Sequence, residues 1–202
     1  MGRKHSSDWF RSATLKEVQK HHTLSLVYDD DTTQEIMIQS FLNPDPAVFK
    51  FCIEHYSETM CQNNINHHNW AYTAKKAPQE HRAHFVELFK KMKLKNQKDI
   101  LYSSIETKDH ELTELFTDLL SAYISPPHLL RHAVVHKNTK MAKLYMNVYP
   151  ESILDADCML MHSSYSKIHE YWHKIHAAHQ NTILMNELKT VKKASAKKIS
   201  KI

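Results

Sequence analysis

Histidines are the residues of this sequence with the most chemistry to offer, and there are 17 of them in 202 residues. His169, His173 and His176 follow one another at spacings of four and three, with His179 three residues further on. On a helix, side chains at these spacings share one side. Neutral imidazole is a ligand for zinc, copper and nickel, so two of these rings one turn apart can share an ion. His169, His173 and His176 are therefore the candidate metal ligands.

A second histidine row, formed by His128, His132 and His136, has the same helical spacing. Neither row has a cysteine or carboxylate at a position that would fix a third ligand, and the HExxH motif of zinc hydrolases does not occur. A metal-dependent enzyme built on these rows remains an alternative. We expect that the purified protein carries no stoichiometric metal and no other cofactor.

Glycine is nearly missing, since Gly2 is the only one. Neither a GxGxxG dinucleotide fingerprint nor a GxxxxGK[ST] phosphate loop can be written, and a GxSxG nucleophile elbow is excluded as well. No local motif selects a nucleophile among the serines and cysteines, so we nominate no catalytic residue. These exclusions favour a protein that is not an enzyme.

The net charge of +5 is confined to the C-terminus, because residues 185–202 hold six lysines and one glutamate. The rest of the chain is neutral, which weakens the case for a nucleic-acid-binding surface over the whole protein. A second basic run covers residues 90–98. The candidate contacts for nucleic acid or an acidic partner are Lys90, Lys91, Lys93, Lys95, Lys98, Lys192, Lys193, Lys197 and Lys198.

The three cysteines, Cys52, Cys61 and Cys158, have no CxxC spacing. An odd, scattered set of this kind is typical of reduced thiols, which predicts a cytoplasmic protein. No stretch approaches the roughly 18 apolar residues of a membrane span. The polar N-terminus has no apolar core of a secretory signal.

Helix signals recur along the whole chain, and no run alternates as a strand would. Thr14 and Thr32 each precede a glutamate by three residues, the capping-box spacing. Asp45 and Ser125 stand before prolines that suit a first helical position. We expect helices at 14–28, 33–42, 46–61, 69–76, 78–94, 97–106, 109–123, 126–136, 139–149, 157–163 and 166–188. The predicted fold is all-α, with a flexible segment 1–12, one helical domain 13–184 and a basic tail 185–202.

An apolar motif recurs in the second half of the chain at offsets of 27, 29 and 27 residues. The motif has apolar residues at its first, fourth and fifth positions, and its copies begin at Phe85, Leu112, Met141 and Ile168. Short amphipathic helices bury such a face by stacking on equivalent helices, which predicts an array of antiparallel helix pairs with little or no β-structure. The register predicts that Leu115 and Leu144 are buried between layers.

Residues 129–145 resemble an ankyrin repeat. The Leu-x-His-Ala helix around His132 and Ala133, the corner at Asn138 and the Met-Ala-x-Leu helix from Met141 follow one another as in that family. The resemblance is strongest over 126–150 and extends more weakly over about 77–175. It implies helix pairs joined by short corners, and a protein-binding role. The chain departs from the family in its shorter unit and its lack of turn glycines, so a generic α-solenoid describes it equally well.

These observations favour a non-catalytic module of degenerate helical repeats that binds another protein. An effector or host-interaction role, in the host cytoplasm, would suit such a chain. A nucleic-acid-binding helical protein that uses the two lysine runs is the main alternative.

Overall fold

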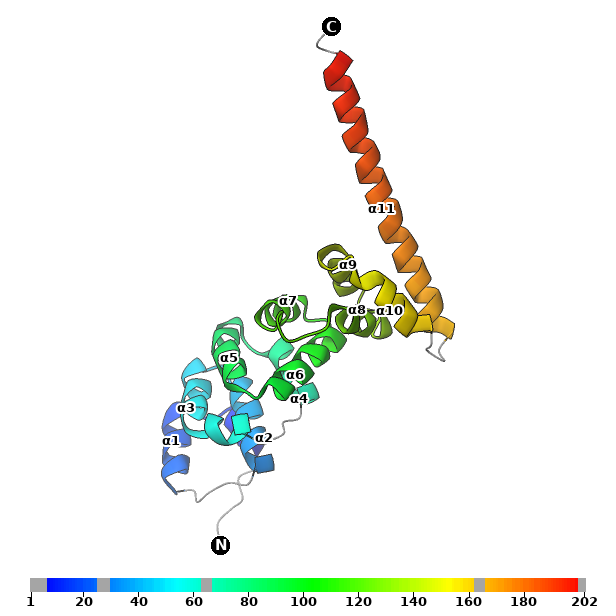
Figure 1. The fold of residues 1–202 in the computed structure, drawn as a ribbon. Coiled ribbons are helices and arrows are strands. Elements are labelled where there is room, and N and C mark those ends of the chain that lie inside the picture. Colours follow the sequence, from blue (N-terminus) through cyan, green and yellow to red (C-terminus); the bar gives the residue numbers. More distant parts are fainter. Residues whose placement is uncertain (1–6, 25–29, 63–66, 162–165, 200–202) are drawn as a thin grey trace. The chain divides into compact units, whose positions relative to one another are not determined.

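The computed structural model describes residues 7–24, 30–62, 67–161 and 166–199, with the backbone alone for some residues beside the gaps. Within these ranges the protein is all-helical, with eleven α-helices, one 3-10 helix and no strand (Figure 1). The all-α prediction is therefore confirmed. The chain divides into two compact units, Met1–Leu120 and Ser121–Ile202. None of the helices in the described ranges is long and apolar enough to cross a membrane.

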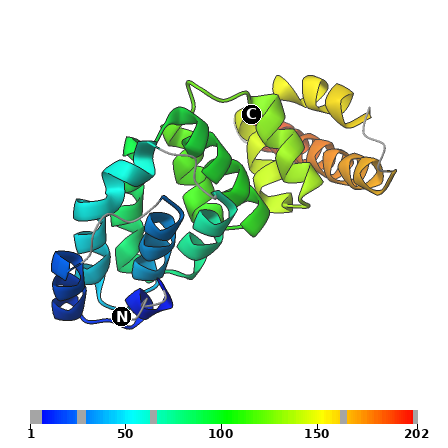
Figure 2. The same cartoon turned by 90° about the horizontal axis from the view of Figure 1, so that it is seen from below.

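The first unit stacks its helices in two rows. Its described elements are η1 (Ser7–Arg11), α1 (Leu15–Leu24), α2 (Asp30–Phe41), α3 (Pro46–Gln62), α4 (His67–Lys76), α5 (Gln79–Lys91), α6 (Leu94–Thr107) and α7 (His110–Leu119). One row contains α2, α4 and α6, and a second contains α3 and α5 (Figure 2). α3 packs on α2, α7 packs on α6, and α1 packs on α3.

Aromatic side chains fill the space between these rows. Trp70 of α4 lies parallel to Phe85 of α5, with ring centroids 5.5 Å apart. Phe89 of α5 stacks on Phe116 of α7 at 4.0 Å. All four rings are buried. Stacked rings add about 0.5–1.5 kcal/mol to the free energy that their burial contributes. The apolar motif at Phe85 thus anchors α5 between its neighbours.

The start of the chain follows its capping signals. The Thr14 amide donates to the Glu17 carboxylate at 2.8 Å, and the Glu17 amide donates to the Thr14 hydroxyl oxygen at 3.4 Å. The capping box predicted for α1 is therefore present. Just before it, η1 lies inside the segment predicted to be flexible, and Phe10 is buried there. The folded part of the described chain accordingly begins before residue 13.

The second unit is built from four helices. They are α8 (Pro126–Val135), α9 (Thr139–Val148), α10 (Ser152–Met161) and α11 (Ser166–Ile199). α8 packs on α9 and α10, and α11 packs on all three. The helix predicted at 166–188 therefore continues eleven residues further, through much of the predicted basic tail.

Two helix corners, α6–α7 and α8–α9, have the same geometry 29 residues apart. Lys108 and Lys137 both adopt the left-handed conformation, with φ of 58° and 52°. The next residues, Asp109 and Asn138, cap α7 and α9 by accepting the amides three residues on, at 3.3 and 3.2 Å. The corners therefore turn without glycine. The left-handed lysines cost roughly 1–2 kcal/mol each.

The same two helix pairs bury equivalent positions. In α7 and α9 the first and fifth residues of the apolar motif, Leu112 with Phe116 and Met141 with Tyr145, are all buried. Leu115, however, is 38% exposed and Leu144 is half-buried. The prediction that both leucines are buried is therefore wrong for Leu115, and Leu144 is only partly buried. The fourth position is turned by about 100° from the fifth, so it lies at the edge of the buried stripe.

Candidate functional site

The site that the structure points to lies in the second unit, along α11. The first half of this helix packs against its own unit through Trp172, Ile175 and His179, which are all buried. From Gln180 to Val191 every residue is exposed. In Figure 1 this second half extends past the last turn of α8, α9 and α10. Because an unpacked helix of this length is marginal in water, its exposed side chains invite a functional explanation.

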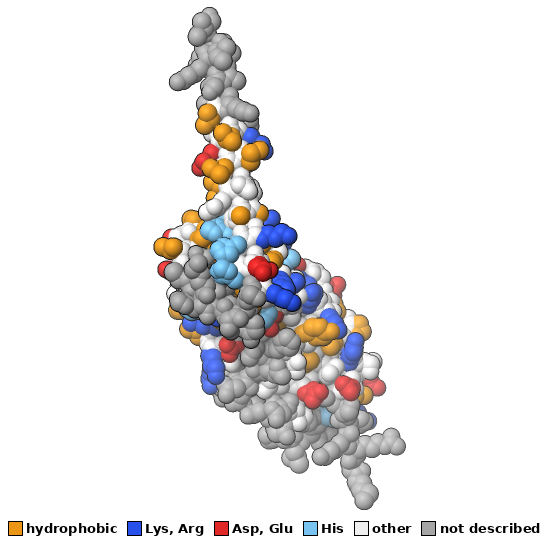
Figure 3. All heavy atoms as spheres, turned by 90° about the vertical axis from the view of Figure 1, so that its right-hand side faces the viewer, with side chains coloured by type: hydrophobic (Ala, Val, Ile, Leu, Met, Phe, Trp, Pro, Cys, Tyr) orange, Lys and Arg blue, Asp and Glu red, His pale blue; other side chains and the backbone are white. Residues whose placement is uncertain are grey.

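The exposed half of α11 carries an apolar stripe, which we define as Leu184, Leu188 and Val191. These side chains are 55%, 55% and 61% exposed, and they follow one another at i, i+4 and i+7. Met185, also exposed, borders the stripe. Figure 3 shows hydrophobic side chains along this part of the molecule, beyond a group of histidines. The spacing is that of the anchor residues of helices that bind in grooves.

The stripe faces away from the unit to which α11 belongs. Leu184 follows Ile175 by nine residues, and Leu188 follows His179 by nine, which is about two and a half helical turns. Each stripe residue therefore points to the side opposite the buried residue. The packed side is continued by Ile183, which lines the groove beside His179, and then by the polar residues Asn186 and Thr190. No bend of α11 toward its own unit would cover the stripe.

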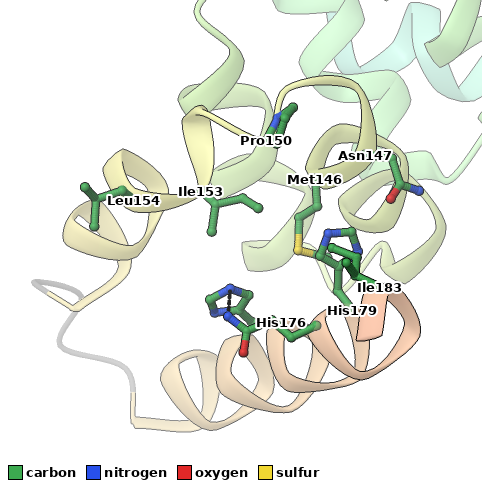
Figure 4. Close-up of a pocket in the computed structure, with 9 residues that line it drawn as sticks. Met146, Asn147, Pro150, Ile153, Leu154, His176, His179 and Ile183 are labelled. Carbon is green, nitrogen blue, oxygen red and sulfur yellow. Dashed lines mark hydrogen bonds between the residues drawn. The ribbon is translucent and has the colours of Figure 1, made fainter. Parts of the chain in front are cut away.

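A groove lies beside the point where α11 leaves the unit. It has a volume of about 460 Å³. Its lining residues are Met146, Asn147, Pro150, Ile153, Leu154, His176, His179, Gln180 and Ile183. Figure 4 shows the α9 and α10 residues across from the histidines of α11. Leu154, which is 72% exposed, extends the apolar surface outward from the groove.

The structure separates the three candidate metal ligands on α11. The Nε2 atoms of His169 and His173 lie 3.1 Å apart. The ring of His176 instead stacks on Trp172 at 5.1 Å, and its Nε2 lies 3.2 Å from Gln180 Nε2. Two of the three predicted ligands are therefore brought together. In each unit taken by itself, no three ligand atoms of histidine, cysteine, aspartate or glutamate converge among the described residues.

The remaining histidines of the two rows differ in their surroundings. Burial, together with His176 and Lys143, lowers the pKa of His179 below its ordinary value. In α8, the rings of His132 and His136 lie 4.4 Å apart, whereas His128 is exposed. The histidine with this lowered pKa lies in the groove wall.

The lysine run at 90–98 is spread over the end of α5, a corner and the start of α6. Lys90 forms an ion pair with Glu87 at 2.7 Å, which removes part of its charge from the run. Lys91, Lys93 and Lys95 are exposed and Lys98 is half-buried. The side chains of Lys192, Lys193, Lys197 and Lys198 lie outside the described residues, although the helix of α11 passes through all four positions.

The cysteines offer no activated thiol among the described residues. Burial raises the pKa of Cys52 to about 12, and burial also raises the pKa of Cys61. A raised thiol pKa lowers the fraction of nucleophilic thiolate. Both cysteines are free, as predicted, and the side chain of Cys158 lies outside the described residues.

The apolar stripe and the groove were missed at the level of sequence. Leu188 and Val191 are visible as isolated apolar residues, but they fall in a segment that the sequence predicts only as a basic tail. The sequence signal for the stripe is that Leu184 and Leu188 follow the buried residues Ile175 and His179 by nine positions, which places them on the opposite side of the helix. The groove is lined by Pro150, just before α10, and by Leu154 of α10, both opposite α11. These residues are distant from α11 in sequence, so no local sequence pattern predicts the groove.

Comparison with known proteins gives no family assignment. No family model matches this chain, and no significant match was found among curated proteins or solved structures.

Proposed function

We propose that this protein is a non-catalytic helical-repeat module that binds another protein through the C-terminal half of α11. The observation that carries the proposal is the position of the stripe Leu184, Leu188 and Val191, exposed and opposite the packed face of its own helix. Isolated apolar residues on a surface are ordinary, but three on one side of an unpacked helix form a docking face.

The repeat description is part of this proposal. Helices stack in rows in the first unit, and the α6–α7 and α8–α9 corners share their capping residues and left-handed lysines. The ankyrin resemblance falls on α8 and α9, where Ala133 is buried and Asn138 caps the second helix. Because the motif recurs every 27 to 29 residues rather than about 33, we favour the broader description, an α-solenoid.

Charge indicates the chemistry of the partner. Residues 183–199 contain five lysines and one glutamate. A helix with an apolar stripe and this excess of positive charge complements an apolar groove with an acidic rim. The side of α11 that bears the stripe has no aromatic residue, which makes insertion into a lipid interface the weaker alternative. We therefore expect a protein partner.

Site-specific photo-crosslinking tests the proposal. A benzophenone amino acid is introduced at position 188, within the stripe, and separately at Asn186, which lies about 200° around the same helix. Both full-length variants are expressed in cells of the source organism and irradiated. We expect one discrete adduct with another protein from position 188 and none from position 186, and we expect Leu184→Glu to abolish it.

Three results would contradict this proposal. No adduct from position 188 would mean that the stripe is not covered. Equal adducts from both positions would mean random collision. A crosslink between two copies of this chain would show that the stripe mediates self-association and does not bind a separate protein.

A further inference from the structure

His169 and His173 are joined by a hydrogen bond between their Nε2 atoms, one ring donating and the other accepting, and this pair is independent of the docking face. Their Nε2 atoms lie 3.1 Å apart and their ring planes cross at 86°. Two metal–nitrogen bonds of 2.0–2.1 Å place their nitrogens about 2.9 Å apart at a right angle and about 3.4 Å apart at a tetrahedral angle. The separation found in the structure lies between these values, so it suits one ion that replaces the proton of the hydrogen bond between the two rings.

The helical turn that carries the pair is fixed to the unit. Trp172, between the two histidines in sequence, is fully buried. The Tyr171 hydroxyl lies 2.6 Å from the Thr139 hydroxyl of α9, which holds the same turn from another side. A chelate on a fixed turn loses little conformational freedom when it binds an ion. His173 itself is exposed and His169 is half-buried, so solvent reaches the pair.

The donor set selects the kind of ion. Two imidazoles with water in the remaining positions suit a borderline transition metal rather than magnesium or calcium. For nitrogen and oxygen ligands the affinity rises from manganese to copper and falls again at zinc. His176 takes no part, because its ring lies against Trp172 and its Nε2 faces Gln180.

We propose that His169 and His173 form a bidentate surface site for a divalent transition-metal ion, with copper(II) the ion bound most tightly. The site is open, since water occupies the other coordination positions. It therefore exchanges its ion readily, and dialysis against a chelator removes it. The role is binding of an exchangeable ion, outside the protein-docking role of the stripe.

The test uses the full chain without an affinity tag. Isothermal titration with copper(II) is carried out on the wild type and on His173→Asn and His176→Asn. Loss of one arm of a chelate is expected to lower the association constant of the site about ten-fold or more in His173→Asn. His176→Asn is the matched control on the same helix, and we expect its titration to match that of the wild type. Substoichiometric copper(II) in a histidine-resolved NMR spectrum should broaden the His169 and His173 ring signals first.

The result that overturns the proposal is specific to the pair. Equal copper(II) affinity in His173→Asn and the wild type would do so. So would earlier broadening of the His132 and His136 signals, because the rings of that pair are also close, at 4.4 Å. Both variants change side chains at least partly accessible to solvent, and a circular dichroism melt confirms that they remain folded.

Discussion

Ile175 and Leu184 point to opposite sides of the same helix. Ile175 is 5% exposed and packs into the second unit, whereas Leu184 is 55% exposed and faces away from it. The nine residues between them turn the helix by about two and a half turns. α11 therefore has two apolar faces in succession, one that holds the helix to its unit and one that remains available.

The two faces should differ sharply in their contribution to stability. Ile175→Ala is expected to lower the free energy of unfolding by about 2–5 kcal/mol, as truncations in a packed core do. Leu184→Ala and Leu188→Ala should change it by less than about 0.5 kcal/mol. Urea titration followed by circular dichroism measures all three. A stability loss at Leu188 as large as that at Ile175 would show that the stripe packs within the folded chain.

The parts of this fold that follow from local chemistry are predictable from sequence. Thr14 with Glu17 forms the capping box expected of it, and Asn138 caps α9 in the corner where the sequence places it. These are contacts between residues three apart. The predicted helices at 126–136 and 139–149 occur as α8 and α9. Proline at the first turn begins α8, where the Ser125 side chain makes no capping hydrogen bond, and Asn138 caps α9.

The parts that depend on contacts far apart in sequence are less accessible. The apolar motif predicts that Leu115 and Phe116 are both buried. Leu115 is nevertheless exposed, because its burial depends on which part of α7 the neighbouring helices cover. The histidine row gives His176 the same weight as His173, yet the ring of His176 turns onto Trp172. Helical spacing places side chains on a face without fixing the rotamers that choose their partners.

Glycine at a left-handed corner should stabilise the protein. Lys137 has φ of 52°, a conformation that glycine adopts without a steric penalty. We expect Lys137→Gly to raise the free energy of unfolding by about 0.5–1 kcal/mol. Glycine removes the steric cost of the left-handed conformation, and this gain exceeds the loss that comes from the larger conformational entropy of the unfolded chain. Arg131→Gly, at an exposed position inside α8, is the matched control and should lower it by about 1 kcal/mol. If Lys137→Gly instead lowers the free energy of unfolding, the backbone conformation is not what decides the stability of this corner.

Stability should fall as the solution becomes mildly acidic. Burial lowers the pKa of His179, and burial together with His55 lowers that of His22. Between each lowered pKa and the ordinary value of about 6.5, the unfolded chain binds more protons than the folded one. The free energy of unfolding is therefore highest above pH 6.5 and decreases as pH falls through that window. We expect the urea midpoint to decrease between pH 7.5 and 5.5.

Variants at the two histidines separate their contributions to this pH dependence. His179→Gln and His22→Gln should each make the pH dependence shallower, and the double variant shallower still. The slope rather than the absolute midpoint is the readout, since both changes also alter packing. A midpoint that does not change with pH in the wild type would contradict the lowered pKa values.

Removal of residues 187–202 should leave the fold intact, and it tests which of the two lysine runs makes any contact with nucleic acid. The side chains of Leu188 and Val191 are exposed, so the shortened protein should lose less than about 0.5 kcal/mol of unfolding free energy. The deletion removes six lysines and one glutamate. If the full chain binds a fluorescent oligonucleotide in an anisotropy titration, that binding should be salt-sensitive and should fall sharply in the shortened chain, because phosphate contacts release counterions. Absence of binding in both chains would remove the nucleic-acid alternative. Lys91, Lys93 and Lys95 of the run at 90–98 are exposed and remain in the shortened chain, so they are the internal comparison for the tail. Oligonucleotide binding that survives the deletion unchanged would move the contact to that run and favour a nucleic-acid-binding surface on the first unit.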